Sequence, residues 1–391
     1  MELLIWTMRK ADTKQAHIGL GSNQGNRFIH LQQAIFKIED EIGLVNARSK
    51  CYKNKAVGFD GDDFINACIV VETVLDPYEV LEKLLAIEIE LGRKRKAHFS
   101  YTNRPIDLDL LYYEDQIINT EHLELPHPRL TQRRFVLQPL MDIAPEKTHP
   151  IDKKTTAELF NKCEDQNDVI AADQTLFLNR KSLWQSSGFI CFEGCIGVGK
   201  TSLCQKIAET FEVPYFLERF EENPFLSSFY EDKEKYSLPV ELSFLADRSE
   251  QIQHNFENIS KRQGILSDYH LSKSLMFAEI NLEGNALALY KRWYHFSLAH
   301  LKTPTLYVYL HRPLEAIKAQ ILKRGRSYEM GISEDYLKKI IQSYEQYVEG
   351  VKNVECLQLN LQNNDFMLDN EVFKQIVVQI EMVLMNQHYL D

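Results

Sequence analysis

The stretch GCIGVGKT at residues 194–201 matches the pattern G-x-x-x-x-G-K-[ST]. Its glycines permit a tight loop whose backbone N–H groups point at phosphate oxygens, beside the positive end of the following helix. In such a loop Lys200 reaches the β- and γ-phosphates of a nucleoside triphosphate, and the Thr201 hydroxyl ligates Mg²⁺. An apolar strand pattern before the loop and a helical pattern after it favour this function over an ordinary glycine turn. The predicted phosphate loop comprises Gly194, Gly197, Gly199, Lys200 and Thr201.

A carboxylate beyond this loop could perform proton transfer. Glu218 ends the short apolar run VPYFLE. A second strand of the same sheet would deliver it to the ligand-binding edge. There it could accept the proton of a neutral hydroxyl nucleophile as a general base. The alternative is that Glu218 belongs to a solvated acidic stretch, and its spacing alone leaves both interpretations open.

A basic segment further along the chain could neutralise phosphate charge. Arg324 and Arg326 flank Gly325 in the segment QILKRGRSYE, which begins with a helical pattern. A short lid carrying these arginines could close over a transferring phosphoryl group and compensate its developing charge. The alternative is a solvated basic helix end, which complements the helix dipole. The phosphate loop upstream favours the lid.

The first half of the chain carries a different kind of candidate site. Asp107 and Asp109 stand two residues apart in RPIDLDLLYY, so on a strand both carboxylates face the same side. Like charges at that spacing are unfavourable unless cations lie between them, and two Mg²⁺ ions bridged by substrate phosphates would supply them. The alternative is the solvent-facing edge of a half-buried strand. The surrounding basic residues favour the metal site: Arg93, Lys94, Arg95, Lys96, Arg104, His127, Arg129, Arg133 and Arg134.

The composition is that of a soluble globular protein with two or three domains. The chain has 391 residues, 44% of them hydrophobic, and a formal net charge of −11 at pH 7. This charge argues against a general nucleic-acid or membrane-surface binder, while a local basic cluster still suits anionic small ligands. Seven scattered cysteines without a C-x-x-C pair favour reduced thiols in a cytoplasmic protein. No stretch is typical of a signal peptide or a membrane span.

The elements that must position these residues differ between the two halves. The first half interleaves strands with helices without strict alternation, which predicts an α+β layered domain. The second half separates buried strands by long helices, which predicts a parallel α/β sheet with helices on both faces. The polar residues between them place a boundary near residue 185. The predicted strands are residues 16–23, 63–75, 104–118, 189–194, 264–270 and 305–312, and the predicted helices are 27–43, 76–92, 201–211 and 333–348.

The motifs of the second half resemble those of the deoxynucleoside kinase family, especially its bacterial purine branch. The matching stretches are EGCIGVGKT, EENPFLSSFY, SDYH and RGRSYEMGI, within residues 188–350. The resemblance implies that Glu218 is the general base for the sugar 5′-hydroxyl. It also implies that Tyr230 and Glu329 hold the 3′-hydroxyl, and that one Mg²⁺ accompanies ATP.

The same resemblance implies base-reading residues and a lid. Glu241 and Arg248 match positions that read the base edge, and Arg324 and Arg326 match lid arginines that contact ATP phosphates. Glu241 stands where the family commonly has Gln, so it can accept from an exocyclic amino group but donates only when protonated. We therefore expect a purine deoxynucleoside substrate, with deoxyadenosine favoured.

Two further departures from the family pattern affect expected roles. Gln320 occupies a position where an additional lid arginine is expected, so the compensating charge is smaller. The Glu-Arg-Ser triplet of animal members is replaced by residues 267–269, in which Asp268 could ligate Mg²⁺ through water or assist the base. The rival is a nucleoside monophosphate kinase, but SDYH lacks the arginine typical of that class.

The first half is similar to 6-hydroxymethyl-7,8-dihydropterin pyrophosphokinase over residues 17–165. The matching stretches are GLGSNQGNR, FINA, GRKRK, RPIDLDLL and PHPRLTQRRFVLQPL. The resemblance implies that Asp107 and Asp109 bind two Mg²⁺ ions and that a ferredoxin-like layered domain carries them. The implied ATP-phosphate contacts are Arg93, Arg104, His127 and Arg133, and the implied pterin contacts are Phe64, Asn66 and Phe135.

The implied reaction moves the β,γ-pyrophosphoryl unit of ATP to the pterin hydroxymethyl oxygen and releases AMP. Stacking between two phenylalanine rings suits a flat pterin. Glu88 matches a carboxylate near the ATP site, with an exposed helix glutamate as the alternative. No residue of this half stands out as a general base, so metal charge and positioning are expected to carry the catalysis.

The whole chain is therefore expected to be a bifunctional enzyme with two separate ATP sites. The expected parts are an N-terminal extension at 1–16, a pyrophosphokinase domain at 17–165, a linker at 166–187 and a kinase domain at 188–391. A homodimer through the second domain is expected, with ATP, hydroxymethyl-dihydropterin and a deoxynucleoside as small-molecule partners. The alternative is that one half has lost catalysis and serves as a dimerisation or regulatory module.

Overall fold

A computed structural model describes residues 13–94, 102–257, 263–326, 329, 331–350 and 354–389. The chain divides into two compact units: unit 1 comprises Met1–Ser182 with Met385–Asp391, and unit 2 comprises Leu183–Leu384. The division lies close to the predicted boundary near residue 185. Two details differ from the predicted parts. Residues 14–16, which the predicted extension included, already belong to a strand, and the last seven residues, which the predicted kinase domain included, join unit 1. Residues 1–12 of the predicted extension, with Arg95 and Lys96, lie outside the described residues.

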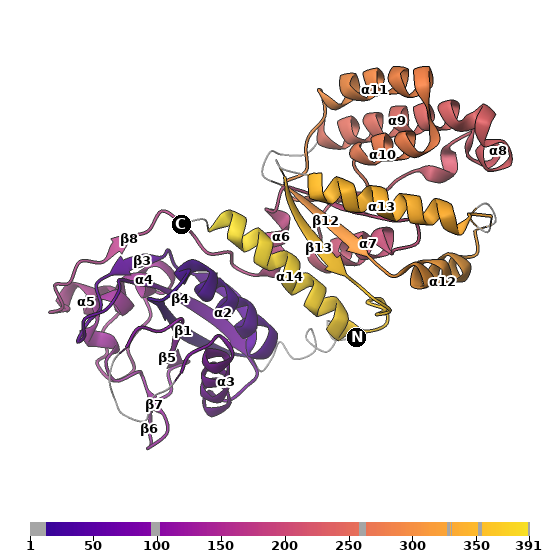
Figure 1. Cartoon of the computed structure of the whole chain (residues 1–391). Coiled ribbons are helices and arrows are strands. Elements are labelled where there is room, and N and C mark those ends of the chain that lie inside the picture. The colour runs from indigo at the N-terminus through magenta and orange to yellow at the C-terminus, as the bar shows by residue number, and fades with distance from the viewer. Residues whose placement is uncertain are drawn as a thin grey trace. The chain divides into compact units, whose positions relative to one another are not determined.

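Unit 1 is built on an antiparallel sheet (Figure 1). The strands follow the order β5-β1-β4-β3-β8, and β2 also pairs with β4. Every residue of β4 except Glu72 is buried, because α2 and α4 pack against this central strand. The strands are β1 Lys14–Ser22, β2 Gly43–Arg48, β3 Tyr52–Asn54, β4 Phe64–Thr73, β5 Asp107–Tyr113, β6 Ile118–Asn119, β7 Glu124–Leu125 and β8 Ile170–Ala171. The helices are α2 Arg27–Glu41, α3 Pro77–Glu90, η1 Leu130–Gln132, α4 Arg134–Ile143 and α5 Thr156–Lys162.

Local sequence explains where the elements of unit 1 begin. Asn26 caps α2 by accepting a hydrogen bond from the backbone N–H of the third residue inside the helix. Asp76 and Glu79 form a capping box at α3, with Pro77 in the first helical position. In β5 the half-buried Asp107 and Asp109 alternate with buried leucines, so the two carboxylates lie on one side of the strand, as predicted.

Unit 2 contains a parallel sheet with the order β10-β11-β9-β12-β13, which confirms the predicted parallel arrangement. Parallel strands bring their carboxyl ends to one edge, and the loops that follow them can share a site there. The strands are β9 Phe189–Gly194, β10 Tyr215–Phe216, β11 Ile265–Ser267, β12 Leu306–His311 and β13 Glu355–Asn360. The helices are α6 Arg180–Gln185, α7 Lys200–Phe211, η2 Phe220–Glu222, α8 Leu226–Glu231, α9 Lys233–Glu257, α10 Ser272–Asn281, α11 Gly284–Leu298, α12 Leu314–Arg324, α13 Glu334–Gly350 and α14 Asn370–His388.

A helical layer covers one part of the unit 2 sheet. The 25-residue helix α9 packs against α8, α10 and α11 (Figure 1). Its sequence carries many charges and an internal Pro239, so its helical period is weak and the sequence did not predict it. Tyr269, Tyr290 and Tyr294 lie in the core between this layer and the sheet. None of the described helices is long and apolar enough to span a bilayer.

The last described residue, Tyr389, is part of the core of unit 1 and is fully buried. Its ring stacks on Phe28 of α2, with centroids 5.8 Å apart. Its hydroxyl donates to Gln32 Oε1 at 2.8 Å, and its carbonyl accepts from Asn26 Nδ2 at 2.9 Å. Tyr389 therefore holds both the cap and the first turns of α2.

We expect Tyr389→Ala to destabilise unit 1 locally by about 3 kcal/mol, because the change removes a buried ring and its hydrogen bonds. Hydrogen exchange followed by mass spectrometry should show faster exchange in α2 and unchanged exchange in α7 of unit 2. Leu368→Ala is the matched control, since Leu368 is 82% exposed. Unchanged protection of α2 in the Tyr389 variant would contradict the assigned packing.

Candidate active sites

The predicted phosphate loop of unit 2 joins β9 to α7. Gly194 and Gly197 have positive φ values of 144° and 78°, which non-glycine residues rarely adopt. A side chain at Gly194 would also lie only 2.4 Å from the carbonyl oxygen of Leu310. Lys200 Nζ donates to the carbonyls of Gly194 and Cys195, at 2.8 and 3.0 Å. The loop thus has the backbone form that its glycines predict.

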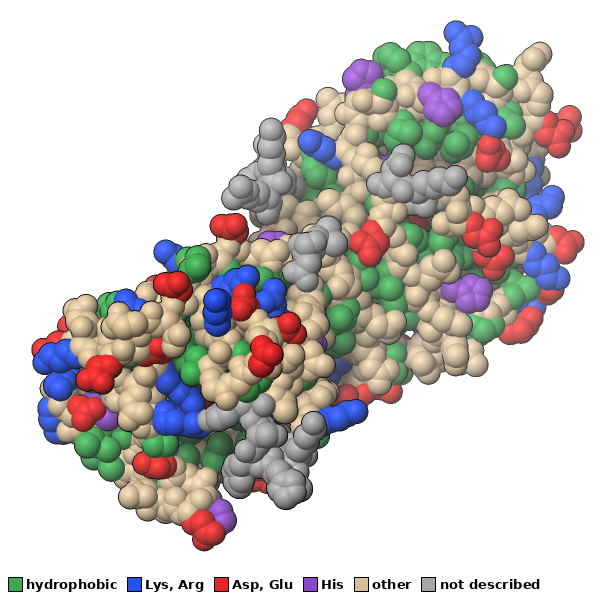
Figure 2. Space-filling model, turned by 60° about the vertical axis from the view of Figure 1, so that its left-hand side comes forward, with side chains coloured by type: hydrophobic (Ala, Val, Ile, Leu, Met, Phe, Trp, Pro, Cys, Tyr) green, Lys and Arg blue, Asp and Glu red, His purple; other side chains and the backbone are tan. Residues whose placement is uncertain are grey.

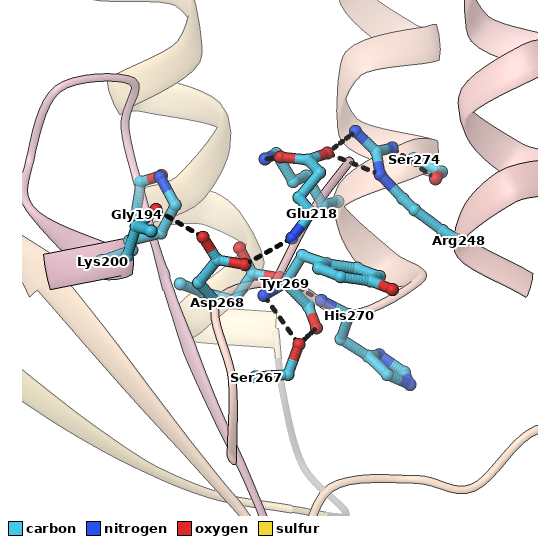
Figure 3. Close-up of polar contacts among 12 residues, drawn as sticks. Gly194, Lys200, Glu218, Arg248, Ser267, Asp268, Tyr269, His270 and Ser274 are labelled. Carbon is cyan, nitrogen blue, oxygen red and sulfur yellow. Dashed lines mark hydrogen bonds and ion pairs between the residues drawn. The ribbon is translucent and has the colours of Figure 1, made fainter. Parts of the chain in front are cut away.

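Asp268, after β11, links the loop helix to the next strand (Figure 3). Its Oδ2 accepts from Thr201 Oγ1 at 2.5 Å, and its Oδ1 accepts from the backbone N–H of Glu218 at 2.9 Å. One hydrogen-bond network therefore joins Thr201, the predicted Mg²⁺ ligand, to Asp268 and to Glu218, the candidate base. A hydroxyl beside a carboxylate is a donor set that suits Mg²⁺.

The Glu218 carboxylate is held between two cations, as Figure 3 shows for Arg248. Arg248 donates from Nε at 2.9 Å and from Nη2 at 2.5 Å, and Lys273 Nζ lies 2.5 Å away. Burial alone would raise the pKa of Glu218, but Lys273 and Arg248 outweigh burial and hold this pKa well below its usual range. The side chain is 12% exposed, so the alternative of a solvated acidic stretch is wrong.

One cavity gathers nearly all of the residues that the sequence assigned to the second site. Its walls include the phosphate loop, the segment after β10, and helices α8, α9, α10, α12 and α13. These walls contain both charged and apolar side chains, which suits the binding of a nucleotide together with a second small ligand. Of the predicted residues, the lining contains Gly197, Lys200, Thr201, Glu218, Tyr230, Glu241, Arg248, Asp268, Arg324, Arg326 and Glu329.

The predicted lid arginines and the predicted sugar contact are joined to each other. Arg324 binds Glu329 through two nitrogens, with Nε 3.1 Å from Oε2. Arg326 Nη1 donates to Glu329 Oε1 at 3.4 Å, and its guanidinium lies 3.9 Å from the centre of the Phe220 ring. All three charged residues line the cavity with Tyr230. The structure thus brings the two arginines and Glu329 to the cavity, where both arginines form ion pairs with Glu329.

Sequence reasoning missed the apolar wall of this cavity and Asn281, and it also missed two buried cations at the site. Lys273 is buried beside Glu218, and its only signal is a helical position shortly after SDYH. Arg312 follows β12 and is also buried. It donates to the carbonyls of Val198 at 3.0 Å and of Asn364 at 2.8 Å, so it fixes the backbone of the phosphate loop.

In unit 1 the two aspartates have different partners. Asp107 pairs with Arg93 at 2.5 Å and with Arg104 at 2.6 Å. Arg93 also binds Glu88, whose Oε1 accepts from the Leu108 backbone N–H at 2.8 Å. Glu88 is 1% exposed, so the exposed-helix alternative for it is wrong. Two predicted phosphate-binding arginines thus converge on one predicted metal ligand.

Asp109 lies beside this cluster with weaker compensation. Its Oδ1 is 3.9 Å from His127 Nε2. Burial and the neighbouring charge of Asp107 raise the pKa of Asp109 to about 6, since both oppose its negative form. Burial and two arginines, Arg133 and Arg129, lower the pKa of His127 to about 4, so this imidazole is neutral at pH 7. The pair of aspartates therefore offers oxygen ligands that a cation would stabilise.

Two glycines of the GLGSN motif lie opposite these aspartates on the neighbouring strand β1. In the register of β1 and β5, Gly19 opposes Asp109 and Gly21 opposes Asp107. A Cβ on Gly21 would lie 2.9 Å from Asn66 Oδ1. The absence of side chains at Gly19 and Gly21 therefore keeps the surface over the carboxylates open.

Two hollows meet at Asp107. One, of about 700 Å³, contains the predicted pterin contacts Phe64, Asn66 and Phe135, and the other, of about 730 Å³, contains Glu88 and Arg93. The predicted ATP contacts are divided, because Arg104 and Arg133 line the first hollow while Arg93 and His127 line the second. Sequence reasoning missed Asn54, Val57 and Phe59 of the first hollow, whereas Arg129 belongs to the predicted basic cluster.

Comparison with known proteins defines both units as ATP-dependent phosphate-transferring enzymes. Residues 190–385 match the family described as deoxynucleoside kinase, and residues 17–145 match the family described as 7,8-dihydro-6-hydroxymethylpterin-pyrophosphokinase. The chain belongs to these two families, one in each half.

Relatives cover each half separately. Deoxyguanosine kinase of Bacillus subtilis (strain 168) is 32% identical over 198 residues, 49% of this chain and 96% of the relative. The 2-amino-4-hydroxy-6-hydroxymethyldihydropteridine pyrophosphokinase of Aquifex aeolicus (strain VF5) is 39% identical over 143 residues, 36% of this chain and 88% of the relative. A solved structure of deoxyadenosine kinase from M. mycoides is 23% identical, with a TM-score of 0.44, over 50% of this chain and 99% of that chain. The protein is thus a fusion of a pyrophosphokinase and a kinase.

The ion pair of Glu218 and Lys273 should be measurable with a double-mutant cycle of E218Q and K273M. We expect a coupling of about 1–3 kcal/mol at pH 7, because both partners are buried. The folded-state pKa of Glu218 lies below the ordinary value of 4.5, so this stability is complete above pH 4.5 and is lost as pH falls through the folded pKa.

Urea unfolding followed by tryptophan fluorescence would report this coupling for unit 2, since Trp184 and Trp293 both lie there and Trp6 can be replaced by Phe. The control cycle uses the exposed pair of Lys291 and Glu279, for which we expect less than about 1 kcal/mol. Equal couplings in the two cycles would contradict the role assigned to Lys273.

Proposed function

We propose that unit 1 transfers the β,γ-pyrophosphoryl group of ATP to 6-hydroxymethyl-7,8-dihydropterin, a step of folate biosynthesis. We propose that unit 2 transfers a phosphoryl group from ATP to the 5′-hydroxyl of a purine deoxynucleoside, a step of nucleotide salvage. The observation that carries both proposals is the presence of two separate carboxylate–cation clusters, each beside its own hollow. The competing possibilities are an inactive half with a regulatory role and a monophosphate kinase in unit 2.

In unit 1 the side chains position two ligands around Asp107. Phe64 and Phe135 offer ring faces for the pterin, and Asn66 offers an amide for its polar edge. Arg93, Arg104, His127 and Arg133 would hold the ATP phosphates, the arginines as charged donors and the neutral imidazole through one N–H.

Asp107 and Asp109 would hold two Mg²⁺ ions together with phosphate oxygens and water. Among the described residues no three His, Cys, Asp or Glu side chains gather into a metal cluster, so these two carboxylates need ligands from the substrate. Bound Mg²⁺ would neutralise phosphate charge during transfer. The β-α-β-β-α-β order of β1, α2, β2, β4, α3 and β5 supports a ferredoxin-like layered class for this unit.

In unit 2 the backbone N–H groups of the loop and Lys200 would bind the ATP phosphates, and Thr201 would hold one Mg²⁺. Glu218 would accept the 5′-hydroxyl proton. Its low pKa makes it a weak base, so proton transfer should come late, after the phosphoryl group has begun to bond to the sugar oxygen. Tyr230 and Glu329 would hold the 3′-hydroxyl, and Arg324 and Arg326 would then turn from Glu329 to the phosphates.

A purine fits the apolar part of the cavity, and Glu241 and Arg248 would read the base. A neutral Glu241 carboxyl both donates and accepts, which matches the adjacent ring nitrogen and amino group of adenine, so deoxyadenosine is favoured. All seven cysteines are free thiols, which agrees with a cytoplasmic location.

We also propose that unit 2 forms a homodimer through α11. Leu289, Trp293 and Phe296 are 43%, 54% and 63% exposed on this helix, while Tyr290 and Tyr294 face the core. Hydrophobic side chains gather at the end of unit 2 that α11 forms (Figure 2). An exposed aromatic stripe of this kind is typical of a self-association surface.

Single substitutions should separate the two activities. We expect Asp107→Ala to lower AMP release with hydroxymethyl-dihydropterin by at least about 100-fold, because a metal ligand is lost. We expect Glu218→Gln to lower ADP release with deoxynucleosides by about 100-fold or more, because the base is lost. Each variant serves as the folding control for the other reaction. Near-wild-type turnover by either variant would refute the role given to its residue, and inactivity of one half in the wild type would favour the regulatory alternative.

The dimer surface can be tested by sedimentation velocity. We expect the double variant W293E/F296E to sediment as a monomer at concentrations at which the wild type is a dimer, because the buried apolar contact is replaced by charge. L368E changes a more exposed hydrophobic residue elsewhere in unit 2 and should leave the mass unchanged. A wild type that remains monomeric at all concentrations would refute the proposal.

A further inference from the structure

Glu241 is a buried carboxyl group with one satisfied and one unsatisfied oxygen. It lies on α9 in the wall of the unit 2 cavity and is 3% exposed. Its Oε1 accepts from Asn281 Nδ2 at 2.8 Å, whereas Oε2 has no hydrogen-bond partner among the described residues. Buried carboxyl oxygens are nearly always paired, so an unpaired one in a cavity wall indicates a ligand group that completes it.

The part of the cavity around Glu241 suits a flat heterocycle. The apolar wall consists of Phe220, Leu226, Phe229, Val240, Phe244 and Phe277. Such walls bind an aromatic ring by its faces and leave only its edge to be recognised by polar groups. Glu241 is placed to contact that edge with the unpaired Oε2 and with the second lone pair of Oε1, whose first lone pair accepts from Asn281.

The neighbouring cations are already engaged by other groups. Arg248 donates from Nε and Nη2 to Glu218 and from Nη1 to Ser274, and Lys273 also binds Glu218. Burial therefore dominates and raises the pKa of Glu241 to about 7, which Asn281 lowers only in part. The titratable groups that act on Glu241 are Arg248 of α9, Glu218 after β10, Lys273 of α10, Tyr290 of α11 and Tyr336 of α13.

Four of these neighbours, Glu218, Arg248, Tyr290 and Tyr336, keep their own charges constant near neutral pH. The pKa of Glu218 lies well below its usual range and that of Arg248 lies above its usual range, so both stay ionised. Burial raises the pKa of Tyr290 and of Tyr336, so both phenols stay neutral. Between pH 6 and 8, Glu241 therefore changes its protonation while these four neighbours do not.

We propose that the protonation of Glu241 selects the purine that unit 2 phosphorylates. The neutral carboxyl offers one donor and one acceptor, which match the ring-nitrogen acceptor and amino donor of adenine. The carboxylate offers two acceptors, which match the adjacent N–H and amino donors of guanine. This inference rests on the proposed nucleoside kinase activity of unit 2, and it assigns deoxyadenosine to the acidic form and deoxyguanosine to the basic form.

The test measures kcat/KM for deoxyadenosine and deoxyguanosine with the full chain from pH 6 to 8. The ratio of the two values cancels the pH effects on ATP and on Glu218, because both substrates share them. We expect the ratio to fall by at least about tenfold between pH 6 and 8, since the ratio of neutral to ionised Glu241 falls by about 100-fold over that range. E241Q keeps one donor and one acceptor at every pH, so its ratio should not change with pH.

E250Q alters an exposed glutamate of the same helix and should retain the wild-type profile. Calorimetry of the wild type in buffers of different ionisation enthalpy gives a readout that needs no variant. Deoxyadenosine should bind with proton uptake near pH 7.5, and deoxyguanosine should bind with proton release near pH 6.5. A constant ratio in the wild type, or a pH-dependent ratio in E241Q, would overturn the inference. Failure to phosphorylate either nucleoside at any pH would instead overturn the proposed kinase function.

Discussion

Both sites depend on the same electrostatic constraint, which is that a carboxylate removed from water must be compensated by nearby positive charge. Glu218 meets it with Arg248 and Lys273, and Asp107 meets it with Arg93 and Arg104. The cations of Glu218 come from α9 and α10, whereas both cations of Asp107 come from the segment between α3 and β5, so packing must be correct before either carboxylate is stable. Around each hollow, the packing of the chain therefore places two cationic side chains beside one carboxylate.

The two units satisfy this constraint with different backbones. In unit 2, parallel strands deliver the phosphate loop, Glu218, Asp268 and Arg312 to one edge of the sheet, because each follows a different strand. In unit 1, one strand carries both aspartates, and the facing strand contributes glycines that leave the acids accessible. Backbone amides and a lysine surround one proposed phosphate site, whereas side-chain arginines and carboxylates surround the other.

Much of this was predictable from the sequence where the signal is local. The parallel sheet, the phosphate loop and the shared face of Asp107 and Asp109 follow from short patterns, because strand alternation and glycine conformations depend on neighbouring residues. The role of Lys273 was not predictable, since it depends on how α10 packs against the end of β10. The burial of Glu88 and the pairing of Arg324 with Glu329 were likewise hidden, because tertiary packing decides between an exposed and a buried charge.

The position of Tyr389 means that the core of unit 1 contains residues from both the beginning and the end of the described chain. The hydroxyl of Tyr389 bonds to Gln32 across a sequence separation of 357 residues. In covalent terms unit 2 is an insertion between two parts of unit 1. A ribosome must therefore synthesise the whole of unit 2 before the core of unit 1 can be completed. Most of unit 1 nevertheless leaves the ribosome before unit 2 does. Cutting the chain between the two halves would give a complete kinase core and an incomplete partner.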